Sequence, residues 1–369
     1  MILHINTAKT WRGGEQQLLY LAEGLHKRNI PQVVVGLPDS ELQSRVGDIP
    51  FEPVNIKGEW DIFSAFKIIK LINKYNIKLI HTHTARAHTI GLFIKIFKPK
   101  LILVVSRRVD FSIKKNLGSK LKYYSPKNNI FLAVSGKIRE ILVEDGVDPE
   151  KVITVYSGIN LKKFDAKVNI AKLKKEFNLS RNTIIVGNIA ALVDHKDQKT
   201  LLKAFSLIPS LKNIKLFILG EGELEEELKA LARDLHLGDR VIFTGFRKDV
   251  PEFLKLFDIF TLTSKEEGLG TTILDAMCNS LPIVATSAGG IGEMIDHEEG
   301  GYLAEPKDSV RIAEYIEKLA SEKSLRTKFG KYNLKNVEKF SVENTILKTI
   351  DVYSNFLGNK FWEQEKPQE

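Results

Sequence analysis

Residues 264–277 read SKEEGLGTTILDAM and directly follow an apolar run at residues 259–263. The run predicts a buried strand, the two glycines predict a flexible loop, and the periodicity after Thr271 predicts a helix. Glu267 on the loop and Asp275 about one turn into the helix can accept hydrogen bonds from hydroxyls of one polyol ligand. A helix-capping carboxylate and a solvent-facing helix residue are the plainer interpretations of these two side chains.

The same alternation of apolar runs and amphipathic stretches extends over the chain of 369 residues. We expect strands at residues 2–6, 32–37, 51–56, 78–82, 101–106, 130–135 and 152–156, and again at 183–189, 214–219, 241–244, 259–263, 282–286 and 301–303. Residues 157–180 are polar, rich in lysine and without a strand pattern, so we expect a linker there. The sequence therefore predicts an α/β fold of two Rossmann-like, doubly wound domains that face each other across a cleft. The predicted domains are residues 1–165 and 180–340, with a C-terminal helix near 341–358 that can pack back on the first.

The composition is that of a folded protein rather than a disordered or fibrous one, with 43% hydrophobic and 27% charged residues. Apolar runs such as residues 101–105 are far shorter than the ~20 residues of a membrane span. The first residues show no basic region and no cleavage site, so we do not expect a secretory signal. A single cysteine, Cys278, excludes an internal disulfide framework and a cysteine-based zinc cluster, and a reducing cytoplasm fits best.

The positive charge is concentrated in one segment. The chain carries a net charge of +9, and residues 91–127 alone hold ten basic residues against one acidic residue, Asp110. Aromatic side chains are interleaved with them, namely Phe93, Phe97, Phe111, Tyr123 and Tyr124. A solvated, lysine-rich surface is the plainest interpretation, and nucleic acid is the weakest because no reader motif is present. The remaining alternative is peripheral contact with an anionic membrane or acceptor, for which the candidates are Arg107, Arg108, Lys114 and Lys115.

Two further segments resemble phosphate-binding elements. Gly13 and Gly14 open a helix after the first strand, where glycines let a ligand approach and helix N–H groups attract an anion. Lys196 follows the strand at 183–189 and precedes a helix, so it can reach a phosphate as a point charge. An ordinary turn and a surface lysine are the plainer interpretations. The glycines at 289–292 do not complete a dinucleotide fingerprint, because Ile295 stands at the third glycine position, which argues against an NAD enzyme.

His81 and His83 end the predicted strand at 78–82 and lie on one face of it. They can form a metal pair, but no third ligand is evident nearby in the sequence. We therefore expect polar residues that face the cleft at the carboxyl end of the strand, and no metal.

Taken together, these residues resemble the retaining glycosyltransferases of the GT-B fold, of the group 1 or family 4 type. Residues 258–306 carry most of the resemblance, with a serine, a Glu-Gly-x-Gly loop, a helix, a Pro-initiated strand, a Gly-Gly pair and a glutamate in the family's order. Residues 156–164 resemble its interdomain segment, and residues 241–250 its nucleotide-side loop. The resemblance covers nearly the whole chain and says little about which sugar is moved.

The resemblance implies transfer of a hexose-type sugar from a nucleotide-diphosphate-sugar to a glycan or lipid-linked acceptor of the cell envelope, such as a polysaccharide or lipopolysaccharide, with anomeric retention. Gly13 and Gly14 would approach the donor diphosphate, and Lys196 would neutralise it as it leaves. The implied donor-sugar and ribose residues are Glu267, Gly268, Leu269, Gly270, Thr271 and Asp275, and His83 would lie near the reacting face. No metal or other cofactor is expected, and the protein would act in the cytoplasm or at the cytoplasmic membrane face.

The sequence also departs from the family pattern. Asp275 stands where glutamate is usual, Leu269 replaces an aromatic residue, residues 278–280 lack the usual glycine, and residues 188–195 contain no arginine to accompany Lys196. A non-catalytic relative that binds a nucleotide-sugar is therefore the alternative function. A nucleotide-sugar epimerase is less favoured, because it lacks the pattern around Glu267.

Overall fold

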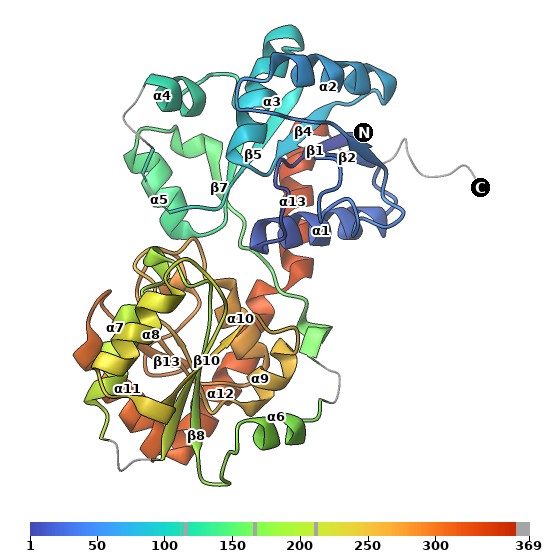
Figure 1. Ribbon diagram of the computed structural model, residues 1–369. Helices are drawn as coiled ribbons and strands as arrows, with labels where there is room; N and C mark the ends of the chain where they lie inside the picture. The colour runs from blue at the N-terminus through green and yellow to red at the C-terminus, as the bar shows by residue number, and fades with distance from the viewer. Residues whose placement is uncertain (111, 114–116, 165–167, 210–212, 359–369) are drawn as a thin grey trace. The chain divides into compact units, whose positions relative to one another are not determined.

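The computed structural model describes residues 1–110, 112–113, 117–164, 168–209 and 213–358 (Figure 1). The chain divides into two compact units, which we describe separately. Unit 1 is Met1–Gly158 together with the chain from Val342 onward, and unit 2 is Ile159–Ser341.

Unit 1 is built on a seven-stranded sheet in the order β3-β2-β1-β4-β5-β6-β7, with every neighbouring pair parallel. The strands are β1 Ile2–Ile5, β2 Gln32–Gly36, β3 Phe51–Pro53, β4 Leu79–Thr82, β5 Ile102–Arg107, β6 Ile130–Ala133 and β7 Val152–Thr154. The helices are α1 Gly13–His26, α2 Ile62–Lys74, α3 Ala85–Phe97, α4 Leu117–Tyr123, α5 Gly136–Glu144 and α13 Val342–Leu357, with the 3-10 turn η1 Pro149–Lys151.

Unit 2 is built on a six-stranded parallel sheet in the order β10-β9-β8-β11-β12-β13. The strands are β8 Ile184–Ile189, β9 Ile214–Leu219, β10 Val241–Gly245, β11 Ile259–Leu262, β12 Ile283–Thr286 and β13 Gly301–Ala304. The helices are α6 Ala171–Glu176, α7 Gln198–Leu207, α8 Glu225–Asp234, α9 Val250–Leu256, α10 Thr271–Cys278, α11 Ser309–Ser321 and α12 Lys323–Asn336. The 3-10 turns are η2 Leu161–Phe164, η3 Asp194–Lys196, η4 Gly238–Arg240, η5 Ile291–Glu293 and η6 Val337–Phe340.

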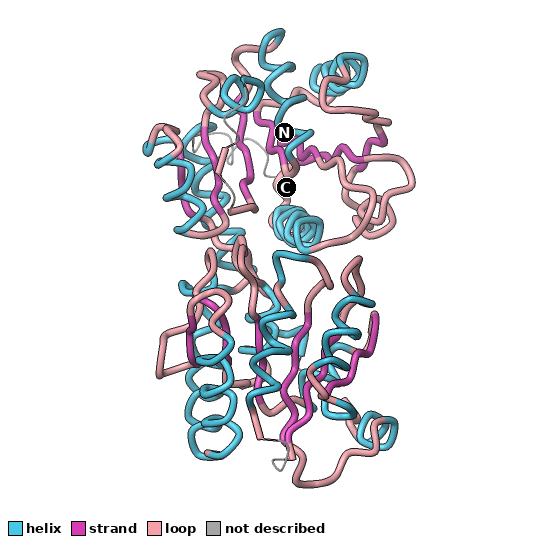
Figure 2. The backbone as a smooth tube through the Cα atoms, turned by 60° about the vertical axis from the view of Figure 1, so that its left-hand side comes forward, coloured by secondary structure: helices cyan, strands magenta, loops and turns pink. Residues whose placement is uncertain are grey.

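These sheets confirm the predicted fold class. The strands of both units are flanked by helices (Figure 2), so strands such as β1 and β11 are buried along their whole length. Buried parallel strands read as continuous apolar runs, which is why the sequence located them. The expected linker at 157–180 is more structured than predicted, because it contains η2 and α6 and lies largely in unit 2.

Helix α13 belongs to unit 1 although it follows unit 2 in the chain, and Figure 1 shows it beside α1. Ile346 and Tyr353 of α13 pack into the same apolar cluster as Leu21 and Leu25 of α1. Gly24 permits this contact, because a Cβ there would lie 2.2 Å from Cδ1 of Ile346. Within the described residues, no helix is both long and apolar enough to cross a membrane.

Candidate functional site

Two loops at the carboxyl edge of the unit 2 sheet bring Lys196 and Glu267 together. Lys196 ends η3 after β8, Glu267 lies in the loop after β11, and their side chains form an ion pair that is mostly buried. The Oγ of Ser264 also donates to the Glu267 carboxylate, at 3.2 Å. These two residues, 71 positions apart in the sequence, therefore form one charged site at the sheet edge where parallel α/β folds bind ligands.

The backbone holds the two loops in register. The Lys265 N–H donates to the His195 carbonyl at 2.8 Å, and the Thr263 hydroxyl donates to the Asp197 carbonyl at 3.1 Å. Thr263 is fully buried, so its hydroxyl must find a partner inside the protein. The ion pair therefore rests on a fixed frame rather than on two independent loops.

Helix α10 starts directly beside this pair. Gly270 precedes the helix with a φ of 83°, a left-handed conformation that favours glycine, and a Cβ there would lie 3.2 Å from Cγ of Glu267. The Ile273 N–H donates to the Gly270 carbonyl at 2.9 Å, whereas the N–H groups of Thr271 and Thr272 have no acceptor in the preceding turn of the helix and can serve an anion or hydroxyl oxygens. Leu269 is buried and packs inward, so only its backbone can face a ligand, whereas Gly268 and Thr271 are partly exposed.

Asp275, on the fifth position of α10, pairs with a residue that the sequence did not single out. Its Oδ1 lies 3.1 Å from Nζ of Lys163 in η2. Burial raises the pKa of Asp275, and Lys163 opposes that rise. Lys163 lies 112 positions earlier in the chain, and only its place beside Phe164 in the interdomain segment signalled it.

In unit 1, Gly13 and Gly14 open α1 as predicted. The Glu15 carboxylate accepts the Arg12 N–H and the side-chain amide of Asn6, each at 3.1 Å, and so fixes the turn before the helix. Arg108 lies against this turn, since a Cβ at Gly14 would be 3.6 Å from its Cδ. Burial lowers the pKa of Arg108 to about 10, a value at which the guanidinium stays charged at neutral pH.

His83 lies in a cluster of three buried histidines. Its Nε2 is 3.1 Å from Nδ1 of His4, while His81 contacts the Tyr353 hydroxyl at 2.6 Å and Ser106 Oγ at 2.8 Å. Burial lowers the pKa of His4 to about 3 and holds those of His81 and His83 well below 6.5, so all three rings are neutral.

The expectation that no third candidate ligand lies near His81 and His83 was wrong. His4 lies opposite His81 in the β1–β4 register, and one nitrogen from each of the three rings lies within 4.8 Å of the others. The sequence did not indicate His4 as a ligand, because His4 lies inside an apolar strand 77 positions before His81 in the chain. Both nitrogens of His81 already have partners, so we interpret the cluster as a hydrogen-bonded one, and the absence of a metal stays a prediction.

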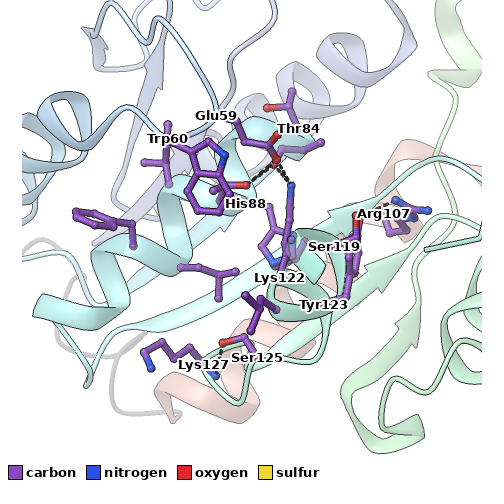
Figure 3. A pocket seen from close by; sticks show the side chains of 18 of the residues that line it. Glu59, Trp60, Thr84, His88, Arg107, Ser119, Lys122, Tyr123, Ser125 and Lys127 are labelled. Carbon is purple, nitrogen blue, oxygen red and sulfur yellow. Dashed lines mark hydrogen bonds and ion pairs between the residues drawn. The ribbon is translucent and has the colours of Figure 1, made fainter. Parts of the chain in front are cut away.

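A cavity of about 930 Å³ lies in unit 1 between α2, α3, α4 and the carboxyl ends of β4 and β5. Figure 3 shows Glu59 and Lys122 pointing toward each other at one side of it. Nζ of Lys122 lies 2.8 Å from the Glu59 carboxylate, and the Thr89 hydroxyl donates to the same carboxylate at 2.9 Å. Arg107 lines it and donates to the Tyr123 hydroxyl at 2.5 Å.

The basic segment is only partly a solvated surface. Arg107 is buried, and Lys95 is also buried and donates to the Pro99 carbonyl at 3.0 Å. Lys114, Lys115 and Phe111 lie outside the described residues. The roles predicted for the site residues of both units, including Arg107 and Arg108, stay predictions.

The chain matches two family models, "Glycosyltransferase Family 4" over residues 11–163 and "Glycosyl transferases group 1" over residues 169–336. It is 27% identical over 306 residues to N-acetyl-alpha-D-glucosaminyl L-malate synthase of Bacillus anthracis, covering 81% of this chain and 80% of that protein. It is 25% identical over 313 residues to UDP-Gal:alpha-D-GlcNAc-diphosphoundecaprenol alpha-1,3-galactosyltransferase of Escherichia coli, covering 81% of each. Among solved structures, a glycosyltransferase from Rickettsia africae superposes with a TM-score of 0.87 at 21% identity, covering 97% of this chain and 98% of that one.

Proposed function

The chain belongs to the group 1 glycosyltransferases and has the GT-B fold. From this premise we propose that it moves a hexose-type sugar from a nucleotide-diphosphate-sugar to a cell-envelope glycan or lipid-linked acceptor. We propose further that the transfer retains the anomeric configuration. The observation that carries the proposal is the Lys196–Glu267 pair at the start of α10. The cation of this pair can bind the diphosphate of such a donor, and the carboxylate can bind the hydroxyls of its sugar.

A bound donor would separate Lys196 from Glu267, because the two side chains would bind different parts of it. Its diphosphate would take Lys196 as a counter-ion, and hydroxyls of its sugar would donate to the Glu267 carboxylate. Each charge then exchanges one partner for another, so neither is left buried and unpaired. Asp275 would accept from the ribose hydroxyls, with Lys163 beside it as a second cation near the nucleotide.

Lys196 would also serve the chemical step. As the bond between the sugar and the diphosphate breaks, negative charge grows on the leaving phosphate, and a fixed cation stabilises that charge more in the transition state than in the bound donor. In this proposal, retention follows from attack by the acceptor on the face from which the diphosphate departs. The leaving phosphate then accepts the acceptor's proton.

For the acceptor, support comes from the Escherichia coli relative, whose name describes transfer to a diphosphoundecaprenol-linked sugar. We extend the proposal to a peripheral contact with anionic membranes through unit 1, where Trp60 and Phe63 are largely exposed and Lys120 is exposed on α4. Phe63→Glu should weaken sedimentation with anionic vesicles at low salt. Equal sedimentation of this variant, or none by the wild type, would contradict the membrane contact.

The function itself is tested in two steps. A thermal-shift panel of UDP-, GDP- and ADP-sugars identifies the donor, because a ligand that binds only the native state raises its stability. Glu267→Gln should then lower turnover of that donor by about a hundredfold or more, since it keeps the volume but removes the charge. Glu266→Gln, at the exposed neighbouring position, is the matched control and should retain wild-type turnover. Donor binding without any turnover in the wild type would favour the non-catalytic alternative.

A further inference from the structure

Two buried threonines lie at the carboxyl ends of adjacent strands, at the sheet edge that carries the Lys196–Glu267 pair. Thr263 directly follows β11, Thr286 ends β12, and both side chains are fully buried. A buried hydroxyl must find its hydrogen-bond partner inside the protein. Each of these two donates to a backbone carbonyl of a neighbouring loop, and the two loops are those that carry Lys196 and Glu267.

Thr286 anchors the loop of Glu267. Its Oγ1 donates to the Ser264 carbonyl at 2.6 Å, and the Ser264 Oγ in turn donates to the Glu267 carboxylate at 3.2 Å. In the loop that follows β12, the Gly290 N–H donates to the Glu267 carbonyl at 3.1 Å. The backbone of the Glu267 loop is therefore bound at two points to one short segment, residues 286–290.

Thr263 anchors the turn that follows Lys196. Its Oγ1 lies 3.1 Å from the Asp197 carbonyl oxygen and 3.4 Å from that of Lys196. Asp197 has a φ of 47°, a left-handed conformation that is less favourable for aspartate than for glycine. Such a turn persists only where surrounding contacts hold it. The Thr200 hydroxyl holds the Asp197 carboxylate at 2.7 Å and Thr263 holds the backbone, so the position of Lys196 depends on Thr263.

These anchors become important when a donor binds. Without a donor, the attraction between Lys196 and Glu267 helps to hold the two loops together. In the proposed function a bound donor separates the two side chains, so this attraction is lost just when their positions decide the chemistry. A misplacement of about 1 Å can lower a rate by about a hundredfold. The loops then need supports that do not involve the two charges.

We propose that Thr263 and Thr286 are positioning residues for sugar transfer, which keep Lys196 and Glu267 at the spacing that the donor requires. The inference rests on the proposed function and adds two residues that, being fully buried, touch neither the donor nor the reacting atoms. Thr263 acts through Lys196 on the diphosphate, and Thr286 acts through Glu267 on the sugar. The sheet, rather than the ion pair, then sets the distance between the two charges.

The test of Thr286 compares the donor identified in the panel with its nucleotide diphosphate. Thr286→Val removes the hydroxyl and keeps the volume, so isothermal titration should show a donor affinity about tenfold or more below that of the wild type. The affinity for the nucleotide diphosphate should stay unchanged, because it carries no sugar for Glu267 to bind. Thr286→Ser keeps the hydroxyl and should restore donor affinity. Equal losses for the two ligands, or no loss for either, would overturn the proposal.

The test of Thr263 uses the same two ligands and the turnover rate. Thr263→Val should weaken the donor and the nucleotide diphosphate alike, because Lys196 binds phosphate in both. It should also lower kcat by about tenfold or more, since Lys196 stabilises the charge of the leaving diphosphate. Thr263→Ser should restore both properties. Wild-type kcat in Thr263→Val would contradict the role of this residue.

Thr261→Val is the matched control. Thr261 is also fully buried on β11, but its hydroxyl donates to the Gly187 carbonyl of β8 at 3.1 Å and to neither loop. Urea unfolding should show a loss of stability in all three valine variants, whereas donor affinity should fall only in Thr263→Val and Thr286→Val. An equal fall in Thr261→Val would show a general effect on the sheet and would overturn the proposal.

A thermodynamic cycle with Glu267→Gln shows whether Thr286 acts through Glu267. In the Glu267→Gln background, Thr286→Val should lower donor affinity by less than about twofold, because the group that it positions has already been changed. The same loss in both backgrounds would overturn the proposal. Wild-type protein that neither binds nor turns over a nucleotide-sugar would refute the proposed function and this inference with it. Wild-type turnover that Thr286→Val leaves unaltered would refute the inference alone.

Discussion

At the scale of single residues, two ion pairs define the candidate site of unit 2. Lys196 and Glu267 are mostly buried and neutralise each other, and Lys163 and Asp275 form a second pair close to the same helix. A buried ion pair gains little net stability, because desolvation offsets the attraction. Lys163 is 44% exposed, and an exposed ion pair also adds little stability. We therefore predict that the charges of both pairs serve a bound ligand more than the fold.

Lys196→Ala should lower kcat of sugar transfer by about a hundredfold or more while raising KM for the donor much less, because the diphosphate gains charge as the bond breaks. Steady-state kinetics with the identified donor measure both parameters. Lys199→Ala is the matched control, since Lys199 lies on α7 and pairs with Glu227 at the surface. An unchanged kcat with a raised KM would show that Lys196 serves only ground-state binding.

Lys163→Met should make donor binding more sensitive to acid. Burial already raises the pKa of Asp275, and loss of the adjacent cation removes a group that lowers it. A carboxylate that protonates at higher pH stops accepting hydrogen bonds from ribose hydroxyls earlier as the pH falls. Donor titrations between about pH 5 and 8 should therefore show the affinity falling at a higher pH in Lys163→Met than in the wild type. Superimposable pH profiles would exclude this role for Lys163.

At the scale of elements, the loop between β11 and α10 connects the unit 2 sheet to the helix of the candidate site and carries Glu267. Gly270 must adopt a left-handed conformation to start α10, and its missing side chain leaves room for Glu267. The local backbone and the position of the catalytic candidate are thus fixed by the same residue.

Gly270→Ala should cost about 1 kcal/mol or more of stability through its backbone strain and should also lower transfer activity by displacing Glu267. Gly238→Ala separates the two effects. Gly238 also has a positive φ, of 53°, but a Cβ there would meet nothing within 4 Å. Urea unfolding should therefore show a loss in both variants, whereas turnover should fall only in Gly270→Ala. Equal turnover in the two variants would contradict the proposed contact.

The sequence could predict the elements because buried parallel strands and glycine-bearing turns leave local patterns. The strand expected at 214–219 is observed as β9 with the same bounds, and the helix expected after Lys196 is α7. It could not predict pairings that depend on packing. Lys163 reaches Asp275 from 112 positions away, and His4 joins His81 only through strand register. The cavity was missed for the same reason, since three helices and two strand ends form it together.

At the scale of the whole molecule, the two units differ in their histidines. Unit 1 buries His4, His81, His83 and His88, and burial lowers the pKa of His4 and of His88 to about 3. The three histidines of unit 2, His195, His236 and His297, are exposed. Acid should therefore lower the stability of unit 1 more than that of unit 2.

The direction in which pH changes the stability of unit 1 follows from the number of protons that each state binds. In the unfolded chain each histidine takes up a proton below about pH 6.5, while in folded unit 1 the four buried rings stay neutral. The unfolded state then binds more protons, so stability is unaffected above pH 6.5 and falls as the pH drops below it, by about 1.4 kcal/mol per pH unit for each ring. Against a domain's usual stability of about 5–15 kcal/mol, losses of this size from several rings are large.

Unit 1 should accordingly begin to lose stability below about pH 6.5, before most of its carboxylates, whose usual pKa values lie near 4, take up protons. Tryptophan fluorescence can follow it, because Trp11 and Trp60 lie in unit 1 and residues 159–341 contain no tryptophan. His88→Gln should make the stability of unit 1 depend less steeply on pH, whereas His26→Gln, at an exposed position on α1, should not. If both variants followed the wild-type curve, the buried histidines would not govern acid unfolding. The acid sensitivity of unit 1 would then have to arise from its carboxylates, such as Glu59, whose pKa is lowered chiefly by its hydrogen bond to Lys122.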